Sequence, residues 1–495
     1  MEFPQGKGVL ERVIGSDECN CNKGFSSSYM LMKPQEAKIS DLGRLLFSSN
    51  LNKRKFLDSS HPKEFNFWHR FFIFLSIIIL KLLQVFATPL AFFGFCFEFW
   101  LNFLSTNDGF SGILLNILRL KLKIPESSSA EYLSVIGHLD GRIMLDKDIK
   151  PGDVNYFGAL CMMASKLAYE NQARVKLVVN DVWKMEFLGF FNFWNEYEEK
   201  CSTQAFMMRD TKVGHHDTII VSFRGTEPFN ADDWSSDFDI SWYEIKGVGK
   251  IHGGFMKALG LQKSKGWPKK IERQDHERRP LAYYTLRKRL KELVKENERT
   301  RFVVTGHSLG GALAVLFPFI LAFHDQKLLL ERLEGVYTFG QPRVGDHKFG
   351  EFMLKTFSRY KIRYYRFVYG FDMVPRLPLD DKALMFKHFG RCIYFDLNYV
   401  AKILEEEPFK NYFSIVGEVV MRIQACLEIG RSFTIGWIRG KEYEERVLLR
   451  LVRLFGLVLP GVPAHCPQDY VNSTRLGSTD IIFSPPKTEY DVKIQ

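Results

Sequence analysis

The sequence lacks the cysteine patterns that indicate disulfide staples or a zinc site. Its eight cysteines are scattered along 495 residues, and no two of them form a CxxC pair. A chain of this length can bury a core without disulfides, so we expect reduced thiols in a protein that faces the cytosol. Cys19 and Cys21 are only a weak hint of metal or redox chemistry, and we expect neither a metal nor an organic cofactor.

Three further features are missing. Residues 1–30 are polar and contain no long apolar run, so a cleaved secretory signal is not expected. No internal repeat is visible. No nucleic-acid recognition module accompanies the net charge of +11, so nucleic acid is not expected as a partner, whereas an anionic membrane surface remains possible.

The excess of positive charge is concentrated in one stretch. Residues 263–300 contain 13 Lys and Arg against 6 Asp and Glu, a net +7. Such a run is usually a solvated face, and the alternative is contact with anionic lipid. A second basic feature is a predicted helix in which Arg446, Arg450 and Arg453 lie among apolar residues. It is either a core helix whose arginines snorkel to solvent or an interfacial helix.

Phenylalanine is abundant, and much of it lies in one segment. Of 45 Phe, 12 fall within Phe65–Leu104. Inside this segment, Phe71–Phe97 carries one formal charge, Lys81, over 27 residues. A helix of that length would be about 40 Å long, enough to cross the hydrocarbon of a bilayer. We therefore expect Phe65–Leu104 to associate with a membrane or a lipid droplet.

How this segment meets lipid depends on Pro89, which interrupts helical hydrogen bonding near its middle. Two short helices meeting near Pro89 would form a hairpin that enters and leaves an apolar phase from the same side. The hairpin places Lys81 and Glu98 at its shoulders. It also suits a droplet, which has no water beyond its monolayer. We therefore favour the hairpin over a single tilted span.

From about residue 130 the pattern changes to α/β. Short β-rich runs alternate with helical stretches, as a mostly parallel sheet requires. In one helical stretch, Leu281–Val294, apolar residues recur at helical spacing. The β-rich runs are Thr218–Phe223, Phe302–Thr305, Val336–Phe339 and Tyr364–Val368.

A GxSxG motif formed by Gly306, Ser308 and Gly310 lies between one of these strands and a predicted helix. In the nucleophile elbow of α/β-hydrolases, the serine occupies a strained strand-to-helix turn where flanking side chains would collide with neighbouring elements. The two glycines remove those side chains, so Ser308 is predicted to be a nucleophile. The turn itself sets the backbone N–H of Leu309 to donate to an oxyanion.

A serine nucleophile needs a base and an acid that orients the base. In α/β-hydrolases the acid and then the histidine follow the serine along the chain. Asp372 is the best acid candidate, because it follows the strand Tyr364–Val368. Beyond Asp372, the remaining bases are His388 and His465. The alternative acids, which are more often turn residues, are Asp380, Asp381 and Asp396.

Several sequence blocks, in this order, resemble the motifs of the class 3 lipases. They fall within roughly residues 150–480. With the apolar segment that precedes them, the whole chain is similar to the plant oil-body triacylglycerol lipases. The blocks are Val221–Thr226, the elbow, Phe339–Asp346, Asp372–Pro378 and His465–Tyr470.

The resemblance implies an α/β-hydrolase fold with a mostly parallel sheet and a catalytic triad of Ser308, Asp372 and His465. The family's HxPxxY block favours His465 over His388 as the base. The resemblance also makes Thr226 the second oxyanion donor. It places a lid over the site, with Phe229, Trp234 and Phe238 as candidates.

The implied organisation has three parts. A polar, loosely ordered lead covers residues 1–60, an apolar anchor covers 61–125 and a hydrolase domain covers 126–495. Insertions lie near 181–200, 263–300 and 400–460. The last of them separates Asp372 from His465, which lie 93 positions apart. It leaves the pocket shape and the acyl-chain preference open.

The activity that the resemblance implies is hydrolysis of triacylglycerol, and also of diacyl- and monoacylglycerol, to free fatty acids. The implied place is the cytosol-facing surface of a lipid droplet, with the endoplasmic reticulum membrane as the alternative. The same triad would also permit phospholipase A1, galactolipase or diacylglycerol lipase activity at a membrane. A non-catalytic droplet scaffold that keeps the fold is a further alternative.

Overall fold

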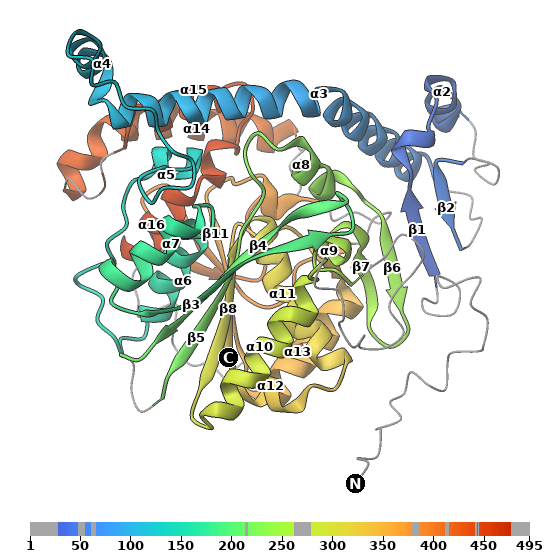
Figure 1. Ribbon diagram of the computed structural model, residues 1–495. Helices are drawn as coiled ribbons and strands as arrows, with labels where there is room; N and C mark the ends of the chain where they lie inside the picture. Colours follow the sequence, from blue (N-terminus) through green and yellow to red (C-terminus); the bar gives the residue numbers. More distant parts are fainter. Residues whose placement is uncertain are drawn as a thin grey trace.

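The computed structural model describes residues 28–47, 55–60, 66–212, 216–261, 279–378, 386–410, 415–440, 443 and 445–476. One large sheet runs through the middle of the molecule, and helices cover both of its faces (Figure 1). A long helix, α3 (Phe67–Thr106), crosses one end of this body.

The large sheet has the order β14-β13-β11-β9-β8-β5-β4-β3. Neighbours from β13 to β5 pair in parallel, whereas β14, β4 and β3 are antiparallel additions at the two edges. The mostly parallel sheet expected of an α/β-hydrolase is confirmed. The strands are β3 (Glu186–Asn195), β4 (Lys200–Asp210), β5 (Thr218–Phe223), β8 (Arg301–His307), β9 (Leu333–Phe339), β11 (Arg363–Tyr369), β13 (Cys392–Phe395) and β14 (Ala401–Leu404).

The sheet separates two apolar cores, because side chains alternate between its faces. In β5, Ile219 and Val221 pack with α10 (Ala282–Glu296) and α11 (Leu309–Phe323). The residue between them, Ile220, packs on the other face with α6 (Tyr156–Leu167) and α16 (Pro467–Leu476). Burial on both faces explains why these strands read as continuous apolar runs.

A second, smaller sheet has the order β12-β10-β7-β6-β1-β2, and its strands pair antiparallel. One end of this sheet comes from the N-terminal part of the chain. Instead of a loosely ordered lead, the described residues 28–47 and 55–59 contain β1, α2 and β2. Met30 and Leu45 of this part are buried in one core with α3. The elements are β1 (Ser28–Met32), α2 (Ile39–Phe47), β2 (Leu57–Ser59), β6 (Trp242–Ile245), β7 (Gly249–His252), β10 (Gly345–Asp346) and β12 (Phe386–Lys387).

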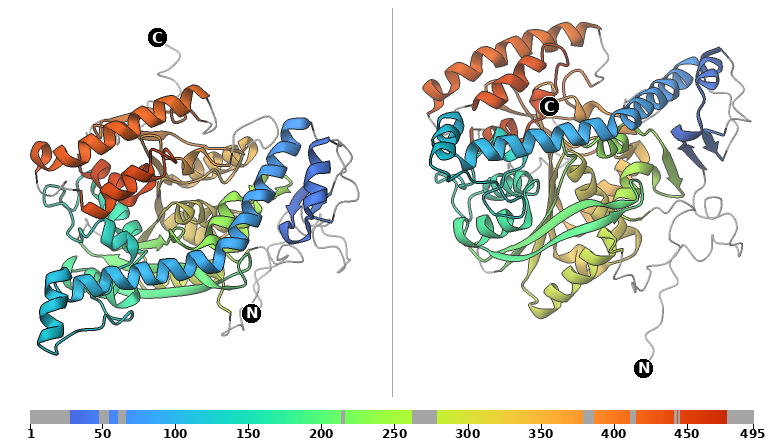
Figure 2. Two further views of the ribbon diagram at one scale, coloured as in Figure 1. Left: turned by 90° about the horizontal axis from the view of Figure 1, so that it is seen from above. Right: turned by 45° about the horizontal axis from the view of Figure 1, so that its top comes forward.

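The hairpin expected within Phe65–Leu104 is absent. Instead α3 is one helix of 40 residues that continues through Pro89, and it is bent rather than broken (Figure 2). It is about 60 Å long, about twice the thickness of the hydrocarbon of a bilayer. Among the described residues, it is the one helix long and apolar enough to cross a membrane.

Both halves of α3 are attached to the rest of the molecule. In the first half, Ile73, Ile77 and Leu80 are completely or almost completely buried. In the second half, the Asn102 side chain donates to the Leu133 carbonyl and accepts from the Leu133 N–H, both at 2.8 Å. The helix is therefore part of the folded body, yet much of its remaining surface is exposed and apolar.

The three expected insertions take different forms. The aromatic-rich stretch near 181–200 contains the edge strand β3, paired with β4. Of the basic stretch 263–300, residues 263–278 lie outside the described residues, and most of the remainder forms α10. The stretch 400–460 contains β14 and two adjacent helices, α14 (Ile415–Arg439) and α15 (Val447–Phe455).

The remaining helices are short. They are α4 (Gly109–Leu118), α5 (Val135–Leu139), α7 (Gln172–Leu177), α8 (Ala231–Phe238), α9 (Gly253–Ala258), α12 (Lys327–Arg332) and α13 (His347–Tyr360). Single turns are η1 (Pro34–Glu36), η2 (Val178–Val182), η3 (Val374–Arg376) and η5 (Pro463–His465).

Gly94 tests the seating of α3 on the body. A Cβ at Gly94 would lie 2.5 Å from the Cβ of Phe229, whereas a Cβ at Gly430 in α14 would meet nothing within 4 Å. We expect Gly94→Ala to lower the free energy of unfolding by about 1–3 kcal/mol through overpacking. The matched control Gly430→Ala should raise it by up to about 1 kcal/mol through helix propensity. Equal effects in chemical denaturation would contradict this packing.

Candidate active site

Ser308 lies at the sharp turn between β8 and α11, with φ 59° and ψ −132°. This positive φ is strained for a residue with a side chain. The turn is tight: a Cβ at Gly306 would lie 2.2 Å from the Gly310 carbonyl, and a Cβ at Gly310 would lie 2.4 Å from the Phe223 carbonyl oxygen. The geometry is therefore that of a nucleophile elbow.

Asp372 and His465, which are far apart in the sequence, form a close pair. Asp372 follows β11, His465 lies in η5, and Asp372 Oδ2 is 2.7 Å from His465 Nδ1. The Tyr470 hydroxyl also donates to Oδ2 at 2.5 Å, and the Val374 N–H donates to Oδ1 at 2.9 Å. The buried carboxylate is thus held by donors on both oxygens and orients the imidazole ring.

The other ring nitrogen of His465, Nε2, is buried and is not bound to Asp372. Within the part of the chain that the structure describes, Nε2 has no hydrogen-bond partner. His465 and Ser308 line the same cavity. The hydrogen bond between a catalytic base and its nucleophile is often loose in structures without substrate and tightens when substrate binds. An unengaged Nε2 is the atom that could take a proton from the serine hydroxyl.

His307 and Tyr169, which sequence reasoning missed, hold the backbone of His465. His307 Nε2 donates to the His465 carbonyl oxygen at 2.9 Å, and the Tyr169 hydroxyl contacts His307 Nδ1 at 2.8 Å. Since a carbonyl only accepts, Nε2 carries the proton and Nδ1 accepts from Tyr169. Burial lowers the pKa of His307 well below its usual value, so the ring stays neutral. His307 is one of the variable letters of GxSxG, and Tyr169 belongs to no motif.

The two candidate oxyanion donors lie next to the elbow. Leu309 is the first residue of α11, where no intrahelical carbonyl accepts from the backbone N–H. Thr226 lines the cavity, and its hydroxyl donates to Asp237 Oδ2 at 3.0 Å. Burial raises the pKa of Asp237 to about 7. While Asp237 is ionised, the hydroxyl hydrogen of Thr226 is engaged with it.

A cavity of about 390 Å³ opens over Ser308, within the usual range for ligand sites. Its walls are apolar and come from several elements. Two lid candidates, Phe229 and Trp234, line it, whereas Phe238 does not. The other apolar wall residues include Phe97 of α3, Val135, Ile136 and Leu139 of α5, and Leu448, Leu451, Val452 and Phe455 of α15.

The other candidates lie elsewhere. His388 is buried outside the cavity, with Nε2 on the Pro375 carbonyl oxygen at 2.7 Å. Asp396 is a turn residue that accepts from the N–H of Asn398 and of Val400. Asp380 and Asp381 lie outside the described residues.

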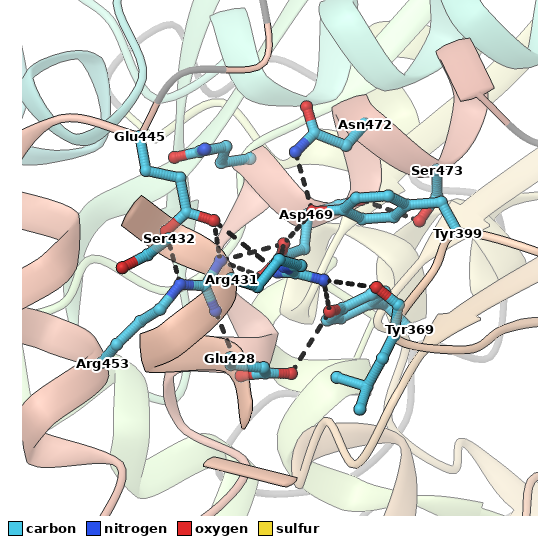
Figure 3. Close-up of polar contacts among 12 residues, drawn as sticks. Tyr369, Tyr399, Glu428, Arg431, Ser432, Glu445, Arg453, Asp469, Asn472 and Ser473 are labelled. Atoms are coloured by element: carbon cyan, nitrogen blue, oxygen red, sulfur yellow. Dashed lines mark hydrogen bonds and ion pairs between the residues drawn. The ribbon is translucent and has the colours of Figure 1, made fainter. Parts of the chain in front are cut away.

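A buried charge cluster, drawn in Figure 3, belongs in part to the 400–460 insertion. It connects this insertion to the segments that carry Asp372 and His465. Arg453 of α15, which is 1% exposed, is its centre. The Arg453 guanidinium lies 2.6 Å from Glu445, 3.0 Å from Asp469 and 3.1 Å from Glu428. Asp469 lies on α16, one turn after His465.

The same cluster reaches the strand before Asp372. The Tyr369 hydroxyl at the end of β11 donates to Glu428 at 3.2 Å and accepts from Arg431 at 2.6 Å. Arg431 also contacts Asp469 at 3.0 Å. The cavity-lining helix α15 and its neighbour α14 are therefore joined to the segments that carry Asp372 and His465.

Comparisons with known proteins show what this chain is similar to. The family model Lipase (class 3) matches residues 220–382. A protein named Triacylglycerol lipase OBL1 from Arabidopsis thaliana is 41% identical over 92% of this chain and 96% of its own. Proteins with the same name from Nicotiana tabacum and Ricinus communis are 43% and 38% identical. They match 83% and 92% of this chain and 84% and 96% of their own lengths.

Arg453→Met tests the charge cluster. The substitution leaves three buried carboxylates without their shared cation, so we expect the free energy of unfolding to fall by about 3–5 kcal/mol. The control Arg422→Met removes an exposed pair with Glu418 in α14 and should change it by less than about 1 kcal/mol. A similar small effect of both substitutions in denaturant titrations would be evidence against the cluster.

Asp237→Asn tests the buried acid beside Thr226. An ordinary aspartate has a pKa of about 4, whereas burial raises that of folded Asp237 to about 7. Between these values the folded state binds more protons, so the wild type loses stability as pH rises. The advantage of Asp237→Asn in free energy of unfolding should therefore grow from pH 4 to 7 and then level off. The exposed control Asp325→Asn should show no such trend, and a pH-independent difference for Asp237→Asn would refute the shift.

Proposed function

This chain belongs to the class 3 lipase family, and from that premise we propose that it hydrolyses triacylglycerol to free fatty acids at the surface of a lipid droplet. The substrate is supported by the plant relatives named triacylglycerol lipase, which match nearly the whole chain. The observation that carries the proposal is the Asp372–His465 pair beside Ser308 on an apolar cavity. Diacyl- and monoacylglycerol present the same ester bond and are proposed as further substrates.

In the proposed mechanism, His465 oriented by Asp372 takes the proton of Ser308 as its Oγ attacks the ester carbonyl. Two donors stabilise the oxyanion of the tetrahedral intermediate: the backbone N–H of Leu309 is one, and Thr226 supplies the other. The intermediate collapses as His465 returns the proton to the leaving diacylglycerol oxygen. Water, deprotonated by His465, then attacks the acyl-enzyme carbonyl. The second tetrahedral intermediate collapses as His465 returns the proton to Ser308 Oγ, and the fatty acid is released.

The apolar cavity supplies what a long-chain substrate needs, since acyl chains gain free energy by leaving water for apolar walls. We assign the cover of the site to Phe229 and Trp234. Phe229 is itself held by α3, with ring centroids 5.5 Å from Phe93 and 5.8 Å from Phe97. A movement that opens this cover would therefore also involve α3.

The proposed location rests on the exposed apolar surface of α3. Val85 and Phe86 are 70% and 56% exposed. A contiguous exposed apolar helix face is typical of an interfacial site. We place this face on the cytosolic side of a droplet monolayer, where triacylglycerol is within reach; the endoplasmic reticulum membrane is the alternative location.

Ser308→Ala tests the nucleophile. We expect loss of oleate release from emulsified triolein by more than about a thousandfold, because the acyl-enzyme cannot form. A fluorophosphonate probe should label the wild type and the exposed-serine control Ser128→Ala, but not Ser308→Ala. Retained turnover or labelling of Ser308→Ala would reject the assignment, and absence of wild-type labelling would favour a non-catalytic scaffold.

The head group is tested with one purified sample on triolein, diolein, phosphatidylcholine and a galactolipid, each presented as an emulsion or vesicle. The proposal expects the highest kcat/KM on triolein. A preference for phosphatidylcholine or galactolipid would replace it with phospholipase A1 or galactolipase activity. A preference for diolein would replace it with diacylglycerol lipase activity.

A further inference from the structure

The helix α15 buries a charged side chain and exposes several apolar ones. Of the three arginines expected to snorkel, Arg446 is exposed. The expectation is wrong for Arg453, which is buried in the charge cluster, and Arg450 donates to the Ser432 carbonyl oxygen at 3.3 Å and lies over the Phe433 ring. The opposite side of the helix carries the apolar residues. Val447 and Leu454 are 69% and 50% exposed.

The neighbouring helix α14 buries polar side chains beside the apolar Met421, Ala425 and Ile435. Its buried residues include Gln424, Glu428 and Ser432. Arg422 and Arg439 of α14 are exposed, but most exposed large residues of the two helices and the turn after α15 are apolar: Val419, Ile423, Leu427, Phe433, Trp437, Ile438, Val447, Leu451, Leu454, Phe455, Leu457, Val458 and Leu459.

This arrangement reverses the usual rule for a surface helix, which buries its apolar stripe and exposes its charges. A buried ion pair adds little stability compared with apolar packing and persists only when each charge is compensated. Here three carboxylates and an arginine hold α15 in place, which leaves Leu451 and Leu454 outside, whereas Leu449 is buried. Such an orientation is favourable when the outer face meets an apolar phase instead of water.

The outer face is continuous with the cavity. Leu451 and Phe455 are 57% and 49% exposed, and both also line the cavity over Ser308. Phe97 of α3 lines the same cavity, and its neighbours Phe92 and Phe95 are exposed. In both Figure 1 and Figure 2, α3 and the α14–α15 pair lie on one face of the molecule.

We propose that the outward faces of α14 and α15, with the turn to Leu459, form a second lipid-docking surface that inserts among the acyl chains of a triacylglycerol droplet monolayer. The choice of a droplet rests on the proposed function; the insertion itself rests on the inverted helices. With α3 on the other side, the two surfaces hold the mouth of the cavity against the lipid. Acyl chains then pass from the droplet into the cavity without crossing water.

The test uses the full chain with Ser308→Ala, so that the droplets are not consumed. Triolein droplets coated with phosphatidylcholine serve as the probe, and the bound fraction is measured by flotation. Trp437→Ser, Ile438→Ser and Val458→Ser are combined, since these residues are 93%, 71% and 67% exposed and do not line the cavity. We expect the partition coefficient to fall at least about tenfold, because each side chain contributes apolar area to the lipid contact.

The control combines Val154→Ser, in the turn before α6, with Leu354→Ser in α13. Both residues are exposed and apolar, and neither lies on α3, α14 or α15. We expect the control to float like the parent. With Ser308 restored, both variants should hydrolyse p-nitrophenyl butyrate at the wild-type rate, which shows that the fold and the site are intact. If the triple variant fails this criterion, Trp437→Ser alone carries the comparison.

Unchanged flotation of the intact variant would overturn the proposal. If that variant also lost a self-association seen by sedimentation in the parent, the face would be an interface between two copies of the chain. The proposed function fails separately, if the wild type releases no oleate from triolein although it floats. Reduced flotation of the variant with a normal rate on the soluble ester supports a docking role distinct from catalysis.

Discussion

The ion pair between Arg453 and Asp469 joins the parts of this molecule that must stay in register. Arg453 belongs to a helix that walls the cavity, and Asp469 lies one turn after His465. Through Glu428 and Tyr369 the same cluster reaches the strand that ends before Asp372. A shift of α15 would therefore disturb the acid–histidine geometry as well as the cavity wall. Ion pairs therefore couple the 400–460 insertion to the geometry of Asp372 and His465.

Much of the α/β body could be predicted from local sequence. The GxSxG motif could be interpreted locally, because a Cβ at Gly306 or Gly310 would collide with backbone only a few residues away or on the adjacent strand. The strands could be predicted because burial on both faces makes them continuously apolar, as in Thr218–Phe223. The pairing of Asp372 with His465 could not be predicted from local sequence. It required the order of serine, acid and histidine along α/β-hydrolase chains and the resemblance to a family.

The errors came from long-range packing. Pro89 suggested a break, but Ile73, Ile77 and Leu80 on one side and Asn102 on the other attach the helix to the body along its length. The inward turn of Arg453 depends on Glu428 and Asp469, whose proximity no local pattern reveals. His307 and Tyr169 were missed because the atom they position is a main-chain carbonyl, which leaves no sequence signature.

The helix α3 has two sides with different tasks. Phe97 walls the cavity, Gly94 makes room for Phe229, and Val85 and Phe86 face outward. A helix that only tethered the enzyme could be cut away to obtain a water-soluble form. Here the cut would expose the core around Ile77 and open the cavity from the side. Producing an enzyme that is soluble without detergent thus requires polar substitutions at the outward apolar residues of α3, with the inward residues unchanged.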